Sequence, residues 1–492
     1  MNAQLMHPGV SAISAYVPAF RIQLADWCDW TGNSWEKIRA VVGRSFRVCG
    51  PHENVYTMAA NAVLRLILQN DVDPERVGFL GLGTESSTDN AAGAVIVRGM
   101  VDRALEQLGR PRLSRSLEVP EFKHACLGGI YALKSALRYV AFDGAERLAI
   151  VVSADIAEYE RGSTGEQTQG AGAVAMLVER NPQLFAVDLH RTGSASAYRG
   201  PDFRKPVARH RVDGYAARTE RPSDFPIFSG KYSTFSYLDE TVHAVEDMLR
   251  RLDVSAGRYY ESVRALFFHR PYHMMPVQAM SFLYVRGLAR GDHHQGELRA
   301  LCEEAGVTFD DVLRETVSTP DLYAQVLRGE HAMDPYRATS AVAALLRKRP
   351  QFQAILRDKM SLGAEVVQDL GNLYSAALPA WMAAGFEEAA GRGLDLTGAP
   401  LVAVGYGSGD AAEAMPLVPV PGWEAAAHRI QLRKMLDGAI DLTREQYEIL
   451  HDRRELPGVP YRTEGQFSIL RVGTSYDANF QDLAVEYYDY VT

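Results

Sequence analysis

The stretch Glu121-Phe122-Lys123-His124-Ala125-Cys126-Leu127-Gly128-Gly129-Ile130 sets a cysteine among small residues, and an apolar-periodic segment, 131–141, follows it. This pattern predicts a tight turn that presents Cys126 at the first turn of a helix. Unpaired backbone N–H groups and the helix dipole favour negative charge there, so we expect the pKa of Cys126 to lie below the value of about 8.5 for free cysteine. A thiolate so placed can attack a thioester carbonyl. The alternative is a buried structural cysteine, because free cysteine is among the most buried residue types.

Composition and charge narrow the class of protein. The chain has 492 residues, a length that suggests about two to four domains or one large duplicated fold. Its net charge of −9 argues against a broad nucleic-acid-binding face. Four widely spaced cysteines without a CxxC pair predict neither a disulfide framework nor a zinc site. The polar run Asp292-His293-His294 lacks the usual spacing of metal ligands. We therefore expect no metal and no nucleic-acid partner.

Hydropathy predicts a cytoplasmic protein. Residues 1–20 contain Pro8 and Pro18 and no Lys or Arg before their apolar part, so they make a poor signal peptide. No apolar run approaches the roughly 18 residues that a membrane helix needs. We expect no membrane partner.

Short apolar segments without charged residues alternate with helical patterns along most of the chain. Such segments between helices are typical of buried parallel strands. The predicted strands are 9–17, 77–83, 148–153, 170–178, 265–268 and 401–404, and the predicted helices are 55–69, 92–108, 237–252 and 425–436. Residues 191–226 are rich in Arg, Gly, Pro and Ser and are predicted to be mostly loop.

Two βαβα halves, each ending in a glycine-rich strand, predict a pseudo-duplicated α/β fold. The expected boundaries are a first half over 1–185, a second half over 186–425 with a charged helical insertion at about 280–368, and a helix with an extended tail over 426–492 that packs on the core. Active residues of parallel sheets gather at the carboxyl ends of strands. Glu85, Asp155 and His269 each stand at or just after the end of a predicted strand. We therefore expect them to share one site with Cys126.

Seven segments identify a family when they are taken in order. They are Gly-Thr-Glu (83–85), His-Ala-Cys-Leu-Gly-Gly (124–129), Ala-Asp-Ile-Ala-Glu-Tyr (154–159), Gly-Glu-Gln-Thr-Gln-Gly-Ala-Gly-Ala (165–173), Phe-His-Arg-Pro-Tyr (268–272), Gly-Asn-Leu-Tyr (371–374) and Gly-Tyr-Gly-Ser-Gly (405–409). In order and context they resemble those of the hydroxymethylglutaryl-CoA synthases, over about residues 9–420. The resemblance implies a thiolase-like fold with α-β-α-β-α layers, the first half carrying Glu85 and Cys126 and the second carrying His269.

The resemblance also implies an aldol-type condensation of thioesters. Cys126 would take an acetyl group from acetyl-CoA, and Glu85 would remove a proton from its methyl group. The carbanion would attack the ketone of acetoacetyl-CoA, whose oxygen His269 would polarise or protonate. Water would then release the product from the cysteine. The residues implied to shape the site or bind the acyl groups are Asp155, Tyr159, Thr168, Asp202, Asn372, Tyr374 and Ser408.

Each of these residues also has a simpler interpretation. Glu85 is compatible with a solvated carboxylate at a strand end, and His269 with a structural histidine. Asp155 is compatible with a helix N-cap before Ile156. Asn372 is compatible with a turn residue, and Ser408 with a residue that satisfies the backbone of its glycine loop.

The sequence departs from the family pattern at several positions. Leu127 replaces the usual Tyr after the nucleophile, which removes a hydroxyl from the expected acyl pocket. Met274 stands where the family usually has a Lys that pairs with a CoA phosphate. Gln167 replaces a Pro, and Ala377 replaces a Ser. The cations that could bind the phosphate instead are Arg204, Lys205, Arg209 and Arg211.

Four functions therefore remain open. The first is synthesis of 3-hydroxy-3-methylglutaryl-CoA from acetyl-CoA and acetoacetyl-CoA. The second is the same aldol step in polyketide β-branching, on an acetoacetyl group carried by an acyl carrier protein. The third is a ketoacyl synthase III-like condensation, against which Glu85 argues, and the fourth is a non-catalytic family member. The family implies a homodimer, and we expect no cofactor besides the thioester substrates.

Overall fold

A mixed sheet of ten strands organises the computed structural model, which describes residues 7–89, 91–202, 204–205, 213–217, 219, 225–291 and 295–492. The strand order is β10-β11-β12-β8-β1-β7-β6-β4-β5, and β9 pairs with β12. The bounds are β1 (Gly9–Tyr16), β4 (Val77–Gly83), β5 (Glu121–Phe122), β6 (Leu148–Ala157), β7 (Gly170–Glu179), β8 (Phe185–Val187), β9 (Gly193–Ser196), β10 (Ala265–Phe268), β11 (Leu401–Gly407) and β12 (Ala411–Pro419).

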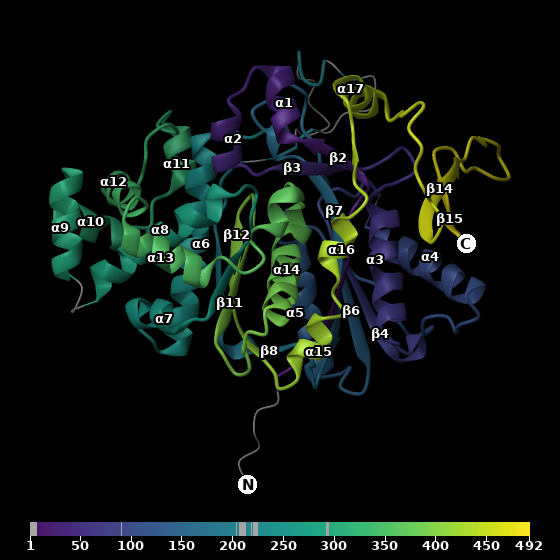
Figure 1. The fold of residues 1–492 in the computed structure, drawn as a ribbon, viewed down its shortest axis with the longest axis horizontal. Coiled ribbons are helices and arrows are strands. Elements are labelled where there is room, and N and C mark those ends of the chain that lie inside the picture. The colour runs from purple at the N-terminus through teal and green to yellow at the C-terminus, as the bar shows by residue number, and fades with distance from the viewer. Residues whose placement is uncertain are drawn as a thin grey trace, which may run out of the picture.

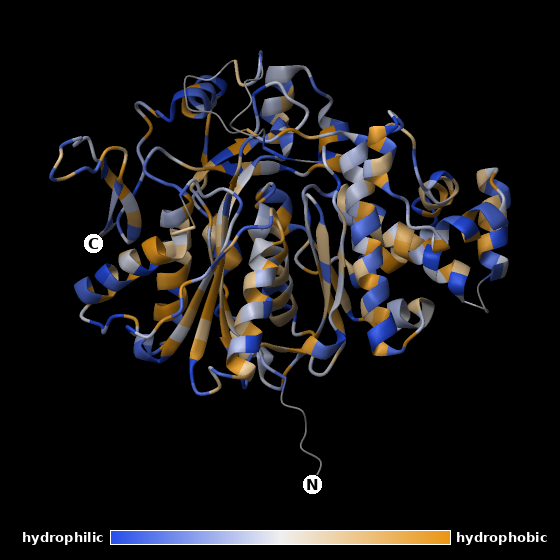
Figure 2. Ribbon diagram, turned by 180° about the vertical axis from the view of Figure 1, so that it is seen from behind, coloured by the Kyte–Doolittle hydropathy of each residue, from blue (hydrophilic) through white to orange (hydrophobic). Residues whose placement is uncertain are grey.

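Two helices lie in the middle of the molecule, between the two halves of this sheet. Helix α5 (Gly128–Ala141) packs on β4 and β6, while α14 (Ala377–Gly391) packs on β10 and β11 (Figure 1). Both are apolar along much of their length and contribute to one large core. Figure 2 shows the apolar residues concentrated in the strands and in the faces that cover them. This layered arrangement is the α/β fold of thiolase-like type that the sequence predicted.

Outer helices cover the two halves of the sheet. Helix α3 (Val55–Gln69) packs on β1, β6 and β7 with α4 (Gly93–Gln107) beside it, and α6 (Lys231–Leu252) packs on β9, β11 and β12. The side chain of Asn54 caps α3 in a capping box with Thr57, which explains why this helix begins where the sequence pattern places it. The charge-free strands β4 and β10 pair in parallel with β6 and β11, respectively, as their sequences predict.

Six helices in the described part of residues 274–359 lie at one side of the molecule (Figure 1). Their bounds are α8 (Met274–Arg290), α9 (Gln295–Ala305), α10 (Phe309–Val317), α11 (Leu322–Leu327), α12 (Arg337–Leu346) and α13 (Pro350–Lys359), and α7 (Ala256–Ser262) packs against α8. The helical character expected for 280–368 is therefore present.

The remaining elements lie on the other parts of the surface. Helices α1 (Leu24–Thr31) and α2 (Trp35–Val41) lie next to a small sheet of β2 (Phe20–Gln23), β3 (Ser45–Val48) and β13 (Ile440–Asp441). The C-terminal elements are α15 (Trp423–Ala427), α16 (Leu432–Leu436), α17 (Arg444–Arg453) and the hairpin of β14 (Gln466–Val472) and β15 (Glu486–Val491). This hairpin packs on α3 and α4.

Three sequence predictions of local structure need correction. The helix predicted over 425–436 is two short helices, because the chain turns at Gln431, whose φ is +53°. The strand predicted to end at Ser153 continues to Ala157, so Asp155 lies inside β6, opposite Gly172 of β7, and is no helix N-cap. The helix predicted from residue 237 already begins at Lys231. None of the helices in the described ranges is both long and apolar enough to cross a membrane.

Candidate active site

Cys126 lies in a tight turn that leads into α5. Ala125 adopts a left-handed conformation with φ of +43°, and the Leu127 N–H donates to the carbonyl of His124 at 2.9 Å. Glycine is required just beyond the turn, because a Cβ on Gly129 would overlap the hydroxyl of Ser153. The close approach of α5 to β4 and β6 that this glycine allows brings Cys126 to the end of β4.

Glu85 meets Cys126 at this point. The Cys126 thiol donates to Glu85 Oε2, with 3.4 Å between sulfur and oxygen. Burial and the neighbouring Asp155 carboxylate raise the pKa of Glu85 to about 8, against a smaller lowering by Cys126 and Lys205. Burial, with Glu85 next to the sulfur, raises the pKa of the Cys126 thiol well above its ordinary value. The expected lowering of this pKa was therefore wrong, because burial and the acidic neighbours Glu85, Asp155 and Asp202 outweigh the helix dipole. Near neutral pH the resting nucleophile is therefore a thiol that lies beside the Glu85 carboxyl group.

Asp155 holds the backbone that carries Glu85. Its Oδ1 accepts from the Thr84 hydroxyl at 2.9 Å, the Glu85 N–H at 2.8 Å, and the N–H and hydroxyl of Ser86 at 3.0 and 2.7 Å. Its Oδ2 accepts from the N–H of Ser375 at 2.9 Å and from the Ser375 hydroxyl. All of these partners are protein groups, and Asp155 is fully buried. The carboxylate therefore positions the Glu85 turn against the segment around Ser375.

His269 follows β10 directly. Its N–H donates to the Val404 carbonyl at 2.7 Å, and its carbonyl accepts from the Tyr237 hydroxyl at 2.9 Å. The imidazole stacks on Tyr406, with ring centroids 6.3 Å apart. Neither ring nitrogen has a hydrogen-bond partner among the described residues, and burial lowers the pKa of His269 to about 3. The ring is therefore neutral near pH 7 and can offer one N–H to a group that enters beside it.

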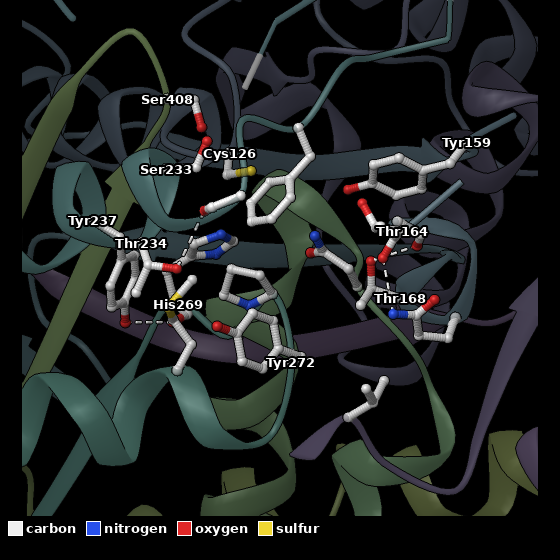
Figure 3. Close-up of a pocket in the computed structure, with 18 of the residues that line it drawn as sticks. Cys126, Tyr159, Thr164, Thr168, Ser233, Thr234, Tyr237, His269, Tyr272 and Ser408 are labelled. Carbon is white, nitrogen blue, oxygen red and sulfur yellow. Dashed lines mark hydrogen bonds between the residues drawn. The ribbon is translucent and has the colours of Figure 1, made fainter. Parts of the chain in front are cut away.

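Cys126 and His269 both line a cavity of about 330 Å³. Figure 3 shows Cys126 and His269 on its wall, with Tyr159, Thr164 and Thr168 on the side opposite Thr234 and Tyr237. The residues from the sequence prediction that line it are Cys126, His269, Tyr159, Thr168, Asn372, Tyr374 and Ser408. Glu85, Asp155 and Asp202 are absent from the described lining and lie behind it.

Several lining residues were missed by sequence reasoning. The N-terminal turns of α6 contribute Lys231, Ser233, Thr234 and Tyr237, and the segment before α8 contributes Tyr272. Lys231 is the one Lys or Arg among the described lining residues. The positions in α6 follow the loop-rich segment 191–226, whose sequence shows no periodic pattern that would have indicated them. Tyr272 ends the family-like segment 268–272 and could have been found there.

Hydroxyl groups cluster on one wall of the cavity. The hydroxyl of Tyr159 interacts with those of Tyr374 and Thr168, and Tyr374 packs against Cys126 in a small buried cluster with Ala157. Asn372 holds this wall, because its side-chain oxygen accepts from the Tyr374 N–H at 2.9 Å. Asn372 thus acts in a turn and also lines the cavity.

Asp202 belongs to a buried acidic pair next to His269. Its Oδ2 accepts from the hydroxyl of Tyr406 at 3.0 Å. Burial, and the adjacent Asp202 with which it is hydrogen-bonded, raise the pKa of Asp410 to about 10. Arg199 lies 3.6 Å from Asp410 and also pairs with Glu240 at 2.6 Å. Asp410 therefore keeps its proton near neutral pH, and Asp202 holds the Tyr406 ring on which His269 stacks.

The residues that differ from the family pattern lie in different parts of the structure. Leu127 is fully buried against Gly405 in the core and is absent from the described lining, so its missing hydroxyl is not a loss to the cavity. Met274 begins α8, and its neighbour Met275 lines the cavity. Lys205 lies close enough to Glu85 to lower its pKa.

The remaining candidate cations and the histidine run named in the sequence analysis do not line the described part of the cavity. Arg204 is exposed and donates to the Pro201 carbonyl at 3.3 Å. Arg209, Arg211 and the run Asp292-His293-His294 lie outside the described residues. In the part of the chain that the structure covers, no group of three His, Cys, Asp or Glu side chains is arranged to hold a metal ion.

Comparisons with known proteins point to one family. A family model described as the N-terminal part of hydroxymethylglutaryl-coenzyme A synthase matches residues 6–183. The chain is 28% identical to a hydroxymethylglutaryl-CoA synthase of Haloferax volcanii over 82% of its own length and 81% of the relative. It is 24% identical to a synthase of Zymoseptoria tritici over 98% of both chains.

Solved structures agree with these sequence matches. MvaS in complex with 3-hydroxy-3-methylglutaryl coenzyme A is 25% identical, with a TM-score of 0.75 over 99% of both chains. The HMG synthase of the curacin biosynthetic pathway, in complex with an apo donor acyl carrier protein, is 20% identical with a TM-score of 0.69, covering 99% of this chain and all of that one. This second likeness shows a shared fold.

Proposed function

The chain belongs to the hydroxymethylglutaryl-CoA synthase family, and on this premise we propose that it condenses an acetyl group held on Cys126 with acetoacetyl-CoA. The products are 3-hydroxy-3-methylglutaryl-CoA and free CoA. One observation carries the proposal: the Cys126 thiol and the Glu85 carboxyl meet at 3.4 Å beside a cavity into which a neutral His269 faces. A nucleophile, a base and a hydrogen-bond donor are the three groups that this reaction needs.

In the first step Cys126 takes the acetyl group. The Glu85 carboxylate accepts the thiol proton as the sulfur attacks the carbonyl of acetyl-CoA. The bond between that carbonyl and the CoA sulfur breaks, and the departing sulfur takes the proton from Glu85 as CoA leaves. This role suits a raised pKa, since a base with a pKa near 8 binds and returns a proton readily close to neutral pH.

In the second step Glu85 removes a proton from the acetyl methyl group. The resulting enolate carbon attacks the ketone carbon of the acetoacetyl group, and a carbon–carbon bond forms. The ketone oxygen becomes an alkoxide, which the N–H of His269 stabilises and which takes its proton from Glu85. Because burial keeps His269 neutral, the imidazole acts as a hydrogen-bond donor rather than as a source of protons.

In the last step water attacks the thioester that joins the product to Cys126. The carbon–sulfur bond breaks, the product leaves with a free carboxylate, and the sulfur regains its proton. The hydroxyl groups of Tyr159, Tyr374 and Thr168 lie on the wall beside Cys126 and are proposed to bind the acyl groups. Asn372 and Ser408 line the same cavity and share this proposed role. Asp155 and Asp202 are proposed to position Glu85 and His269. No cofactor is required.

A second candidate is the same condensation with the acetoacetyl group on an acyl carrier protein. It is favoured by Met274, which supplies no cation at the position where the family usually pairs a lysine with a CoA phosphate. Lys231 at the cavity wall can pair with the phosphate of either carrier. The two candidates differ in carrier and agree in chemistry. In either case we propose a cytoplasmic homodimer.

The test follows product formation by mass spectrometry with acetyl-CoA and either acetoacetyl-CoA or an acetoacetyl carrier protein. Product from acetoacetyl-CoA, lost in Cys126→Ala, is the expected result. Product from the carrier protein alone would support the second candidate instead. If folded protein made no product with either acceptor, the condensing function would be wrong.

A further inference from the structure

The segment between β6 and β7, residues 158–169, forms one side of the cavity. It contributes Tyr159, Thr164, Gly165, Gln167 and Thr168 to the lining. The family usually has a proline at position 167, which would restrict the backbone, and this chain has glutamine. Hydrogen bonds inside the segment, such as the one from the Thr168 hydroxyl to the Gly165 carbonyl at 2.8 Å, hold part of this wall. Contacts from outside the segment hold the parts that carry Tyr159, Glu166 and Gln169.

Helix α17, almost 300 residues further along the chain, makes these contacts. The Tyr447 hydroxyl donates to Glu166 Oε1 at 2.9 Å and accepts from Gln169 Nε2 at 2.8 Å. The side-chain oxygen of Gln169 in turn accepts from the backbone N–H of Tyr159 at 2.8 Å. His451 Nε2 donates to the Tyr159 carbonyl at 2.8 Å. Two side chains of α17 therefore bind both ends of the segment.

These contacts are buried and are made by a well-anchored helix. The exposed fractions of Tyr447 and His451 are 2% and 4%, and those of Glu166 and Gln169 are 3% and 1%. A capping box between Thr443 and Gln446 fixes the start of α17. Tyr447 also packs in the apolar cluster around Phe46. Buried hydrogen bonds of this kind fix geometry, because each group that loses its partner stays without water.

Ion pairs also join the segment 158–169 to α17 and to the residue that follows it. Arg161 pairs with Asp452 at 2.5 Å and with Glu448 at 3.1 Å, and Arg454 of the C-terminal segment lies 3.3 Å from Glu158. The Glu166 carboxylate also accepts from the Gly162 N–H at 2.6 Å. The whole segment is thus held between the cavity and α17.

We propose that Tyr447 and His451 are positioning residues that hold the Tyr159 wall of the cavity in place for the reaction. The proposal rests on the condensing function, because the wall they hold carries the hydroxyl groups beside Cys126. Tyr447 and His451 are absent from the described lining of the cavity. They act through Glu166, Gln169 and the backbone of Tyr159, and so they set where the acyl group sits relative to Cys126.

Tyr447→Phe is the first test, because it removes one hydroxyl and keeps the packing. Misplacement of the wall by about 1 Å is expected to lower kcat by about tenfold to a hundredfold. It is also expected to speed hydrogen exchange at the Tyr159 amide, which Gln169 no longer holds firmly. The matched control is Tyr488→Phe, which removes a hydroxyl that bonds to Asn54 and Glu486 in the C-terminal hairpin, away from the described lining.

His451 supplies the second test, which also covers the case that Tyr447→Phe does not fold. His451→Leu removes the donor to the Tyr159 carbonyl and is expected to lower kcat and speed exchange in the same segment. His451→Gln keeps an N–H donor and is expected to restore most of both. Variants with wild-type kcat and wild-type exchange over 158–169 would overturn the proposal.

The exchange measurement separates this proposal from the proposed function. If the wild-type protein makes no product, the condensing function fails, and exchange over 158–169 still reports on the contact. Faster exchange in Tyr447→Phe and His451→Leu, with Tyr488→Phe unchanged, would support the positioning role. Unchanged exchange in these variants would refute it.

Discussion

Replacement of Asp155 by asparagine tests how the site is held together. Asp155 accepts from four donors at Oδ1 and from two at Oδ2, all of them buried or half-buried. Asparagine turns one of these oxygens into an NH₂ group, which would face the Ser375 N–H. A lost hydrogen bond to a charged group costs about 1.5–3 kcal/mol, and a buried donor without a partner costs about 1–3 kcal/mol. We therefore expect Asp155→Asn to lower the free energy of unfolding by about 2.5–6 kcal/mol.

The same substitution also changes the electrostatics at Glu85. The Asp155 charge is, after burial, the largest cause of the raised Glu85 pKa. Without that charge the pKa of Glu85 falls below about 8, so any activity that needs the carboxylate appears at lower pH than in the wild type. The pH dependence of Cys126 acetylation reports this shift in the fraction that remains folded.

The assay is urea unfolding of Asp155→Asn beside Thr84→Val. The control removes one of the six donors and keeps the shape of the side chain, so its expected cost is that of one hydrogen bond to a charged group, about 1.5–3 kcal/mol, with no unpartnered donor added. An unfolding midpoint and a pH profile of Asp155→Asn equal to those of the wild type would refute the view that Asp155 is an ionised anchor beneath Glu85.

Further predictions concern the groups around the cavity. The rate of product formation should rise as the pH increases through about 8, where Glu85 loses its proton. Glu85→Gln should abolish this rise. A wild-type rate that does not change through this range would contradict the role of Glu85 as the base. His269→Ala should slow condensation far more than Cys126 acetylation, because the imidazole acts on the ketone oxygen, and equal losses in single-turnover assays would count against this role. Gly129→Ala should lower the free energy of unfolding by about 1–3 kcal/mol, because the added methyl group overlaps Ser153. An unchanged melting temperature would disprove the close approach of α5 to β6 at this position. The pKa of Asp410 is raised in the folded state, so the free energy of unfolding of the wild type should fall as the pH rises above the pKa of Asp410 in the unfolded chain. Asp410→Asn should lose less of this free energy between pH 5 and pH 9 in urea titrations. An equal loss in the variant and the wild type would exclude a proton held on Asp410.

Local sequence patterns predicted much of the fold. Strand β4 and helix α3 have the predicted bounds, because each has a clear hydrophobic period or a charge-free run and distinct residues at its ends. Strand β6 was predicted too short, since its pairing with β7 continues beyond the apolar run and includes Asp155. That end is set by a neighbouring strand, which the local pattern does not contain.

The sequence predicted which residues lie at the site better than it predicted the pKa of Cys126. Cys126, His269 and the hydroxyl wall were expected in one place, and they line one cavity; their roles stay predictions. The pKa of Cys126 was predicted in the wrong direction, because the local sequence reveals the helix start and not the carboxyl groups around the sulfur. Likewise, Asp155 meets Ser375, 220 residues away, and Tyr447 reaches Glu166 across 281 residues. Contacts at such separations depend on the tertiary fold.

The central claim is that Cys126 carries the acetyl group and Glu85 activates it. The most direct measurement is intact-mass spectrometry of the protein after mixing with acetyl-CoA, with Cys126→Ala as the control. We predict a gain of one acetyl group that maps to Cys126, is absent from the control, and disappears when an acetoacetyl thioester is added. Folded wild-type protein that gains no acetyl group, or that gains it equally in Cys126→Ala, would contradict the account.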